Sequence, residues 1–131
     1  MEAYKATNFK VLTKPPFILN IGKRSKEVLE VFEHTSSNCA GYLTAWNPYS
    51  QSMSGEENEQ AHHRLLAQLD LDNYQVWMAI GEDPSGEWGG ETSAFVLGMP
   101  RSDAAAYGKQ FEQNAIVWVG NTGVPELVRL R

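Results

Sequence analysis

The stretch that decides the fold is TAWNPYSQSMSGEEN, residues 44–58. It overlaps an apolar run, Cys39 to Trp46, that is typical of a buried strand. That strand is expected to end at Asn47-Pro48, because the residue before a proline avoids the helical region and the proline has no N–H for a strand ladder. Ser54 and Glu57 then have the spacing of a capping box, which predicts the start of a helix.

Apolar spacing predicts the other elements on both sides of this stretch. We expect an irregular segment and then a short strand over 9–21, helices over 25–35, 54–70 and 102–111, strands over 39–46, 74–80, 92–97 and 115–119, and an edge strand over 126–130. Two helices that follow alternate strands favour a ferredoxin-like, or split βαβ, core with both helices on one sheet face. The expected fold class is α+β, a single domain over residues 1–131 with a mixed or antiparallel sheet and two or three helices.

Length and composition restrict the class of protein. The chain has 131 residues, of which 42% are hydrophobic and 21% charged, as in an ordinary globular domain. No apolar run approaches the roughly 20 residues that span a bilayer, and the first residues lack the character of a secretory signal. The single Cys39 cannot form an internal disulfide, which suits a reducing compartment. We therefore expect a cytoplasmic protein without a membrane partner.

The charge balance argues against binding to nucleic acid. The net charge is −5, whereas affinity for phosphates depends on clustered lysines and arginines. The densest basic group is Lys23, Arg24 and Lys26, and three glutamates follow it within one predicted helix. This pattern is typical of a solvated helix face. We expect no nucleic-acid partner, and the sequence leaves the oligomeric state open.

The helix that starts at Ser54 carries polar side chains on its inward face. At 100° per residue, Asn58 and His62 lie on the same side as Leu65 and Leu69. A buried amide or imidazole without a partner costs about 1–3 kcal/mol, so these groups need partners. Either they tie the preceding loop to the helix, or they form part of a ligand site at the helix N-terminus.

Other polar groups also stand at the ends of predicted elements. Glu91 opens a strand, and Gln113 and Asn114 directly precede another. Trp46 and Trp88 lie next to polar loops, where an indole can contact a ligand. We predict a pocket for a polar small molecule, lined by Trp46, Asn47, Ser50, Asn58, Glu91, Gln113 and Asn114.

Evidence for a reaction is weaker. His62 titrates near neutrality and Glu91 opens a strand, so these two are the candidates for a general base in a small enzyme. His62 and His63 point about 100° apart on a helix, which does not suit a shared metal ion. The glycine-rich segment 81–90 has no lysine and three acids, the opposite of a phosphate cradle. We expect neither a metal nor a cofactor.

A protein-interaction or self-associating module without catalytic activity is the remaining alternative. It would use the predicted edge strand over 126–130 or the loop that contains Trp88.

Several spaced motifs resemble a family of small bacterial proteins catalogued as domain of unknown function 3293. They are Thr44-Ala45-Trp46-Asn47-Pro48 with Ser50, Ser54 with Glu57-Asn58, Glu91 with Ser93 and Leu97-Gly98, and Gln113-Asn114-Ala115 with Trp118. The resemblance covers nearly the whole chain and implies a bacterial or bacteriophage-related source and a stand-alone domain. It implies no activity, so the function stays unknown. The chain departs from the family at Glu112, where glycine is frequent, and at His62-His63, where arginine is expected.

Overall fold

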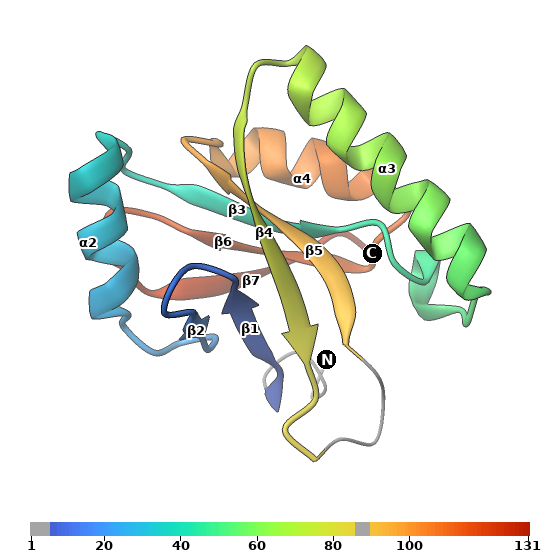
Figure 1. Cartoon of the computed structure of the whole chain (residues 1–131), viewed down its shortest axis with the longest axis horizontal. Helices are drawn as coiled ribbons and strands as arrows, with labels where there is room; N and C mark the ends of the chain where they lie inside the picture. The colour runs from blue at the N-terminus through green and yellow to red at the C-terminus, as the bar shows by residue number, and fades with distance from the viewer. Residues whose placement is uncertain (1–5, 86–89) are drawn as a thin grey trace.

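The fold is built on a single, curled antiparallel sheet (Figure 1). The computed structural model describes residues 6–85 and 90–131. Within them the strand order is β2-β1-β4-β5-β3-β6-β7, and every neighbouring pair is antiparallel. The strands are β1 (Asn8–Val11), β2 (Phe17–Leu19), β3 (Ala40–Thr44), β4 (Gln75–Glu82), β5 (Glu91–Leu97), β6 (Ala115–Val119) and β7 (Pro125–Arg129).

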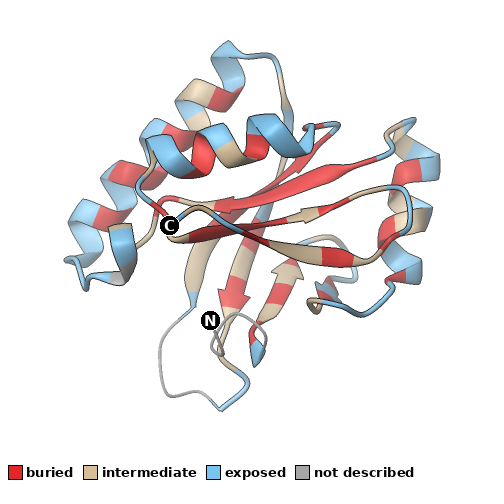
Figure 2. Cartoon of the chain, turned by 180° about the vertical axis from the view of Figure 1, so that it is seen from behind, coloured by how far each residue is buried: buried red, intermediate tan, exposed pale blue. Residues whose placement is uncertain are grey.

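Helices cover both faces of this sheet, because the strands are apolar on both sides. α2 (Lys26–Thr35) packs on one face, where Val28 and Phe32 meet Phe95 of β5. α3 (Gly55–Leu71) and α4 (Arg101–Gln110) pack on the other, against a core that includes Ala94 and Val96. Figure 2 shows buried residues on the sides of the helices that face the sheet. A short 3-10 helix, η1 (Pro48–Ser50), joins β3 to α3.

Side-chain caps fix the starts of two helices where the sequence predicts them. Ser25 accepts a hydrogen bond from the N–H of Val28 at 3.0 Å, and α2 begins directly after it. Ser54 accepts from the N–H of Glu57 at 3.1 Å, and its hydroxyl lies 3.0 Å from the Glu57 carboxylate. Ser54 is therefore confirmed as the N-cap of α3, and the Glu57 carboxylate bonds to its hydroxyl.

The α+β class and the three helices are confirmed, but two local predictions are wrong. Residues 8–11 are not irregular: they form β1, which pairs with both β2 and β4 because Phe9 and Val11 point into the core together. Ser102 does not cap α4, which begins at Arg101 after Pro100 and has no side-chain cap. The edge strand is confirmed, at Pro125–Arg129.

The close approach of α4 to the sheet leads to a prediction at Gly108. A Cβ at this position would lie 2.5 Å from both Ile116 Cγ2 and Leu130 Cδ1. Overpacking costs about 1–3 kcal/mol, whereas alanine gains only about 1 kcal/mol over glycine in a helix. We expect Gly108→Ala to lower the free energy of unfolding by about 1 kcal/mol, measured by urea denaturation.

Gly55 provides the matched control, because a Cβ there meets nothing within 4 Å. Gly55→Ala should lose no stability. Equal unfolding midpoints for Gly108→Ala and the unmodified protein would contradict the close approach.

Candidate functional site

Asn47 and Asn58 form a reciprocal pair at the junction of β3, η1 and α3. The Asn58 side-chain oxygen accepts from the Asn47 backbone N–H at 2.8 Å, and the Asn58 amide donates to the Asn47 side-chain oxygen at 2.9 Å. That Asn47 oxygen also accepts from the N–H of Met53 at 3.1 Å. Asn47 has a left-handed backbone with φ 48°, which asparagine tolerates better than most residues. The asparagine pair thus ties the η1 turn to the first turns of α3.

Glu91 joins the asparagine pair from the start of β5. Its carboxyl group lies near the Asn47 side chain. Burial raises the pKa of Glu91, and the polar Asn47 side chain acts in the opposite direction by favouring the charged carboxylate. The structure therefore brings three predicted site residues together, and two of them, Asn47 and Asn58, are hydrogen-bonded to each other.

The turn that follows α4 is fastened to the same region. The N–H of Tyr49 donates to the Glu112 carbonyl at 2.6 Å. The Gln113 amide donates to the carbonyls of Trp46 at 3.3 Å and Phe111 at 3.1 Å. Gln113 is buried, so its side chain acts as an internal bridge between the two turns.

The remaining predicted residues lie at the margin of these turns. Ser50 is the last residue of η1. Asn114 accepts a hydrogen bond from the Arg131 guanidinium at 3.2 Å. That guanidinium also lies 4.0 Å from the centre of the Tyr49 ring, a cation–π contact that connects Asn114 to η1. Trp88 lies outside the described residues.

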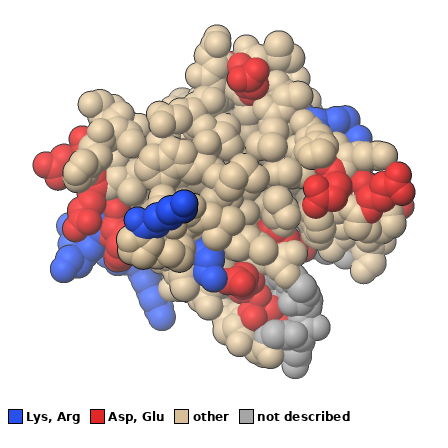
Figure 3. Space-filling model, viewed as in Figure 1, with Lys and Arg blue, Asp and Glu red and all other residues tan. Residues whose placement is uncertain are grey.

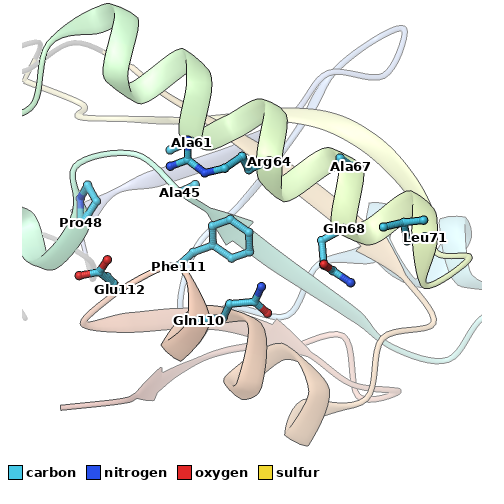
Figure 4. Close-up of a pocket in the computed structure, with 10 residues that line it drawn as sticks. All are labelled: Ala45, Pro48, Ala61, Arg64, Ala67, Gln68, Leu71, Gln110, Phe111 and Glu112. Atoms are coloured by element: carbon cyan, nitrogen blue, oxygen red, sulfur yellow. The ribbon is translucent and has the colours of Figure 1, made fainter.

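A groove of about 470 Å³ opens between α3 and α4 next to the two turns (Figure 4). Its walls are formed by Ala45, Pro48, Ala61, Arg64, Ala67, Gln68, Leu71, Gln110, Phe111 and Glu112. In Figure 4 the Phe111 ring stands near the middle, with Arg64 on the α3 side and Glu112 next to Pro48. Trp46, Asn47 and Gln113 do not line the groove, but a residue adjacent to each of them in the sequence does: Ala45, Pro48 and Glu112.

A second hollow of about 560 Å³ continues along the same seam and shares Leu71 and Gln110 with the groove. In it the Tyr74 hydroxyl donates to Asp103 at 2.7 Å, and the Tyr107 hydroxyl donates to Asp72. Burial raises the pKa of Tyr74 to about 12, helped by Asp103, and raises that of Tyr107 as well. Both phenols are therefore protonated at neutral pH, and each satisfies one carboxylate.

Within the part of the chain that the structure describes, the charged groups of the groove form no ion pair. The ion pairs found among the described residues join Lys10 to Glu82 and Arg101 to Glu126. Neither Arg64 nor Glu112 belongs to these pairs.

His62 lies on the inward face of α3, one turn beyond Asn58. It is 3% exposed, and both of its ring nitrogens are buried without a hydrogen-bond partner among residues 6–85 and 90–131. Burial lowers its pKa, while Glu59 acts in the opposite direction and His63 adds to the lowering. The imidazole is therefore neutral at physiological pH.

The surface charge and the donor groups limit the other kinds of site. In the view of Figure 3, basic and acidic side chains are intermixed at the α2 end of the molecule, and acidic ones gather at the α3 end. No three His, Cys, Asp or Glu side chains of residues 6–85 and 90–131 come together as metal ligands. None of the described helices is both long and apolar enough to cross a bilayer.

The sequence patterns missed the residues that line the groove. Ala61, Arg64, Gln68 and Leu71 recur at spacings of three and four, so they share one face of α3 beside the apolar one. The available signal in the sequence was Leu71, an apolar residue at the end of this otherwise more polar face. In the structure Leu71 is 74% exposed. Phe111 and Glu112 follow α4 and carry no periodic pattern that could have identified them.

A family model described as "Protein of unknown function (DUF3293)" matches residues 43–116. The chain belongs to this family. The part that matches DUF3293 runs from β3 into β6 and contains every residue that lines the groove. No curated protein and no solved structure matches the chain.

Glu112 stands at a position where the resemblance described above leads one to expect glycine. The N–H of Gln113 donates to the Gly108 carbonyl at 2.9 Å, which closes the end of α4, and Glu112 has a left-handed backbone with φ 58°. Glycine adopts this conformation without the cost of about 1 kcal/mol or more that a Cβ imposes. The structure thus explains why glycine suits this position.

We therefore expect Glu112→Gly to raise the free energy of unfolding by about 1 kcal/mol, measured by urea denaturation. Glu112→Ala removes the same carboxylate but keeps the Cβ, so it should give no comparable gain. Equal gains from both variants would mean that the carboxylate, rather than the backbone, limits stability.

His62 generates a pH-dependent prediction. Its pKa in the folded protein lies below the ordinary value of 6.5, so the unfolded chain takes up the proton first as the pH falls. The contribution to stability is complete above about pH 6.5 and is lost as the pH falls through the lowered pKa. We expect urea midpoints to fall over this window, and His62→Leu should remove that part of the pH dependence.

The neighbouring His63 is exposed and serves as the control. His63→Leu should retain most of the pH dependence of the unmodified protein, because burial is the largest cause of the lowered His62 pKa and His63 is the smallest. The assignment to His62 is wrong if the two variants behave alike.

Proposed function

We propose that this protein binds a small polar molecule in the groove between α3 and α4. The observation that carries the proposal is the end wall of the groove, where Pro48 and Glu112 stand on two turns that are bonded to each other. Sites for small molecules are usually formed before the ligand arrives, and a wall fixed in this way loses little freedom on binding. A volume of about 470 Å³ lies within the range of such sites.

The predicted site residues take a different role in this proposal. Asn47, Asn58 and Gln113 bond to each other or to backbone groups, so they position the wall rather than contact the ligand. Glu91 supports Asn47 in the same way.

A catalytic role for His62 or Glu91 is less well supported than binding. A general base must come within hydrogen-bonding reach of its substrate, yet His62 is nearly completely buried on the inward face of α3. Glu91 is partly buried and lies next to Asn47. Neither side chain lines the groove.

We also infer that β3 to β6, with α3 and α4, form a ferredoxin-like core. The support is the order β4-β5-β3-β6 with both helices on one face, which is also what places the two helices side by side. An experimental structure with α3 and α4 on opposite faces would contradict this inference.

A thermal-shift screen across metabolites and nucleotides tests the proposed binding. A ligand that binds only the folded state raises the melting temperature, with about 2.7 kcal/mol of added stability at 100 times its Kd. We expect at least one such ligand, and we expect Ala67→Phe to cancel its shift, because Ala67 is exposed and lines the groove.

Gln60→Phe is the matched control, since it adds the same ring to an exposed position of α3 outside the groove. Shifts that survive equally in both variants would place the ligand elsewhere and overturn the proposal.

A further inference from the structure

We propose that the ligand of the groove is a zwitterion, a molecule the size of an amino acid or short peptide that carries both a carboxylate and an ammonium group. This inference rests on the proposed binding function and adds the chemical class of the ligand.

Two opposite charges face the groove from different elements. Arg64 comes from α3, whereas Glu112 comes from the turn after α4 and lies next to Pro48 (Figure 4). Among the described residues neither takes part in an ion pair. A guanidinium binds a carboxylate through two parallel hydrogen bonds, and a carboxylate accepts from an ammonium. One molecule with both groups can therefore engage both walls.

The other surfaces of the groove suit the rest of such a molecule. The Phe111 ring and the small side chains of Ala45 and Ala61 offer an apolar contact for methylene groups. Further along, Gln68 and Gln110 present amides from opposite helices (Figure 4). Amides can both donate and accept, as the peptide group of a dipeptide requires.

Other ligand classes fit the charges less well. A phosphate-rich ligand needs several cationic groups, but the groove has one arginine and continues into a hollow with Asp72 and Asp103. A ligand with only positive charge would meet Arg64, and an uncharged one would leave both charged groups unused. The zwitterion is the class that uses Arg64 and Glu112 together.

A series of ω-amino acids tests this inference and measures the separation of the two contacts. The probes are glycine, β-alanine, 4-aminobutanoate, 6-aminohexanoate and diglycine, each compared with the acid and the amine that lack one charge. Binding is followed by ¹⁵N chemical-shift changes of groove amides. We expect one member of the series to bind about fivefold more tightly than either singly charged analogue, which is the upper value for an exposed ion pair.

The variants separate the two contacts. Arg64→Gln should remove the preference for the amino acid over the amine, and Glu112→Gln should remove the preference over the acid. Arg24→Gln and Glu33→Gln, at exposed positions near or on α2, should change neither preference.

The outcomes distinguish this inference from the function on which it rests. If no member binds, or if amino acids bind no better than their singly charged analogues, the zwitterion inference is overturned. A neutral or anionic ligand that Ala67→Phe displaces would leave groove binding intact and overturn the zwitterion alone. If Ala67→Phe displaces nothing, both proposals fail.

Discussion

Two reciprocal hydrogen bonds between Asn47 and Asn58 hold the end of β3, the η1 turn and α3 in one arrangement. Asn58 is 3% exposed, so its amide could not recover hydrogen bonds from water if Asn47 moved away. Each unpaired group would then cost about 1–3 kcal/mol. The asparagine pair therefore fixes the position of the α3 N-terminus relative to β3. Since α3 forms the first wall of the groove, the pair also positions that wall.

The second wall depends on small residues. Gly108 brings α4 close to Ile116, and a Cβ at Gly41 of β3 would lie 3.3 Å from that of Ala104. Along the sides where α3 and α4 face each other, Ala61, Ala67 and Ala106 are too small to fill the seam. Close packing against the sheet and small side chains between the helices together leave an open groove where larger residues would form a closed contact.

Local signals in the sequence predicted much of the fold. The caps at Ser25 and Ser54 and the apolar runs of the central strands depend on neighbouring residues, so they were visible without a structure. Contacts between distant residues were not. Thr44 pairs with Ser93, and this register brings Glu91 alongside the end of β3, where it meets Asn47. The sequence could place polar residues at element ends, but only the register decides which of them bond to each other.

His62 lies next to the asparagine pair on α3 but takes no part in its hydrogen bonds. Asn58 and His62 share the inward face of α3, four residues or about 6 Å apart along the helix axis. The residue before η1, Asn47, bonds to Asn58, whereas neither nitrogen of His62 has a partner among the described residues. The inward face thus combines one satisfied polar residue with one whose burial keeps it neutral. The neighbouring face of α3 carries Arg64 and Gln68, which line the groove. A polar residue that is required to build a site and a polar residue that is available to bind can therefore lie on adjacent faces of one helix, and a hydrophobic pattern alone does not separate them.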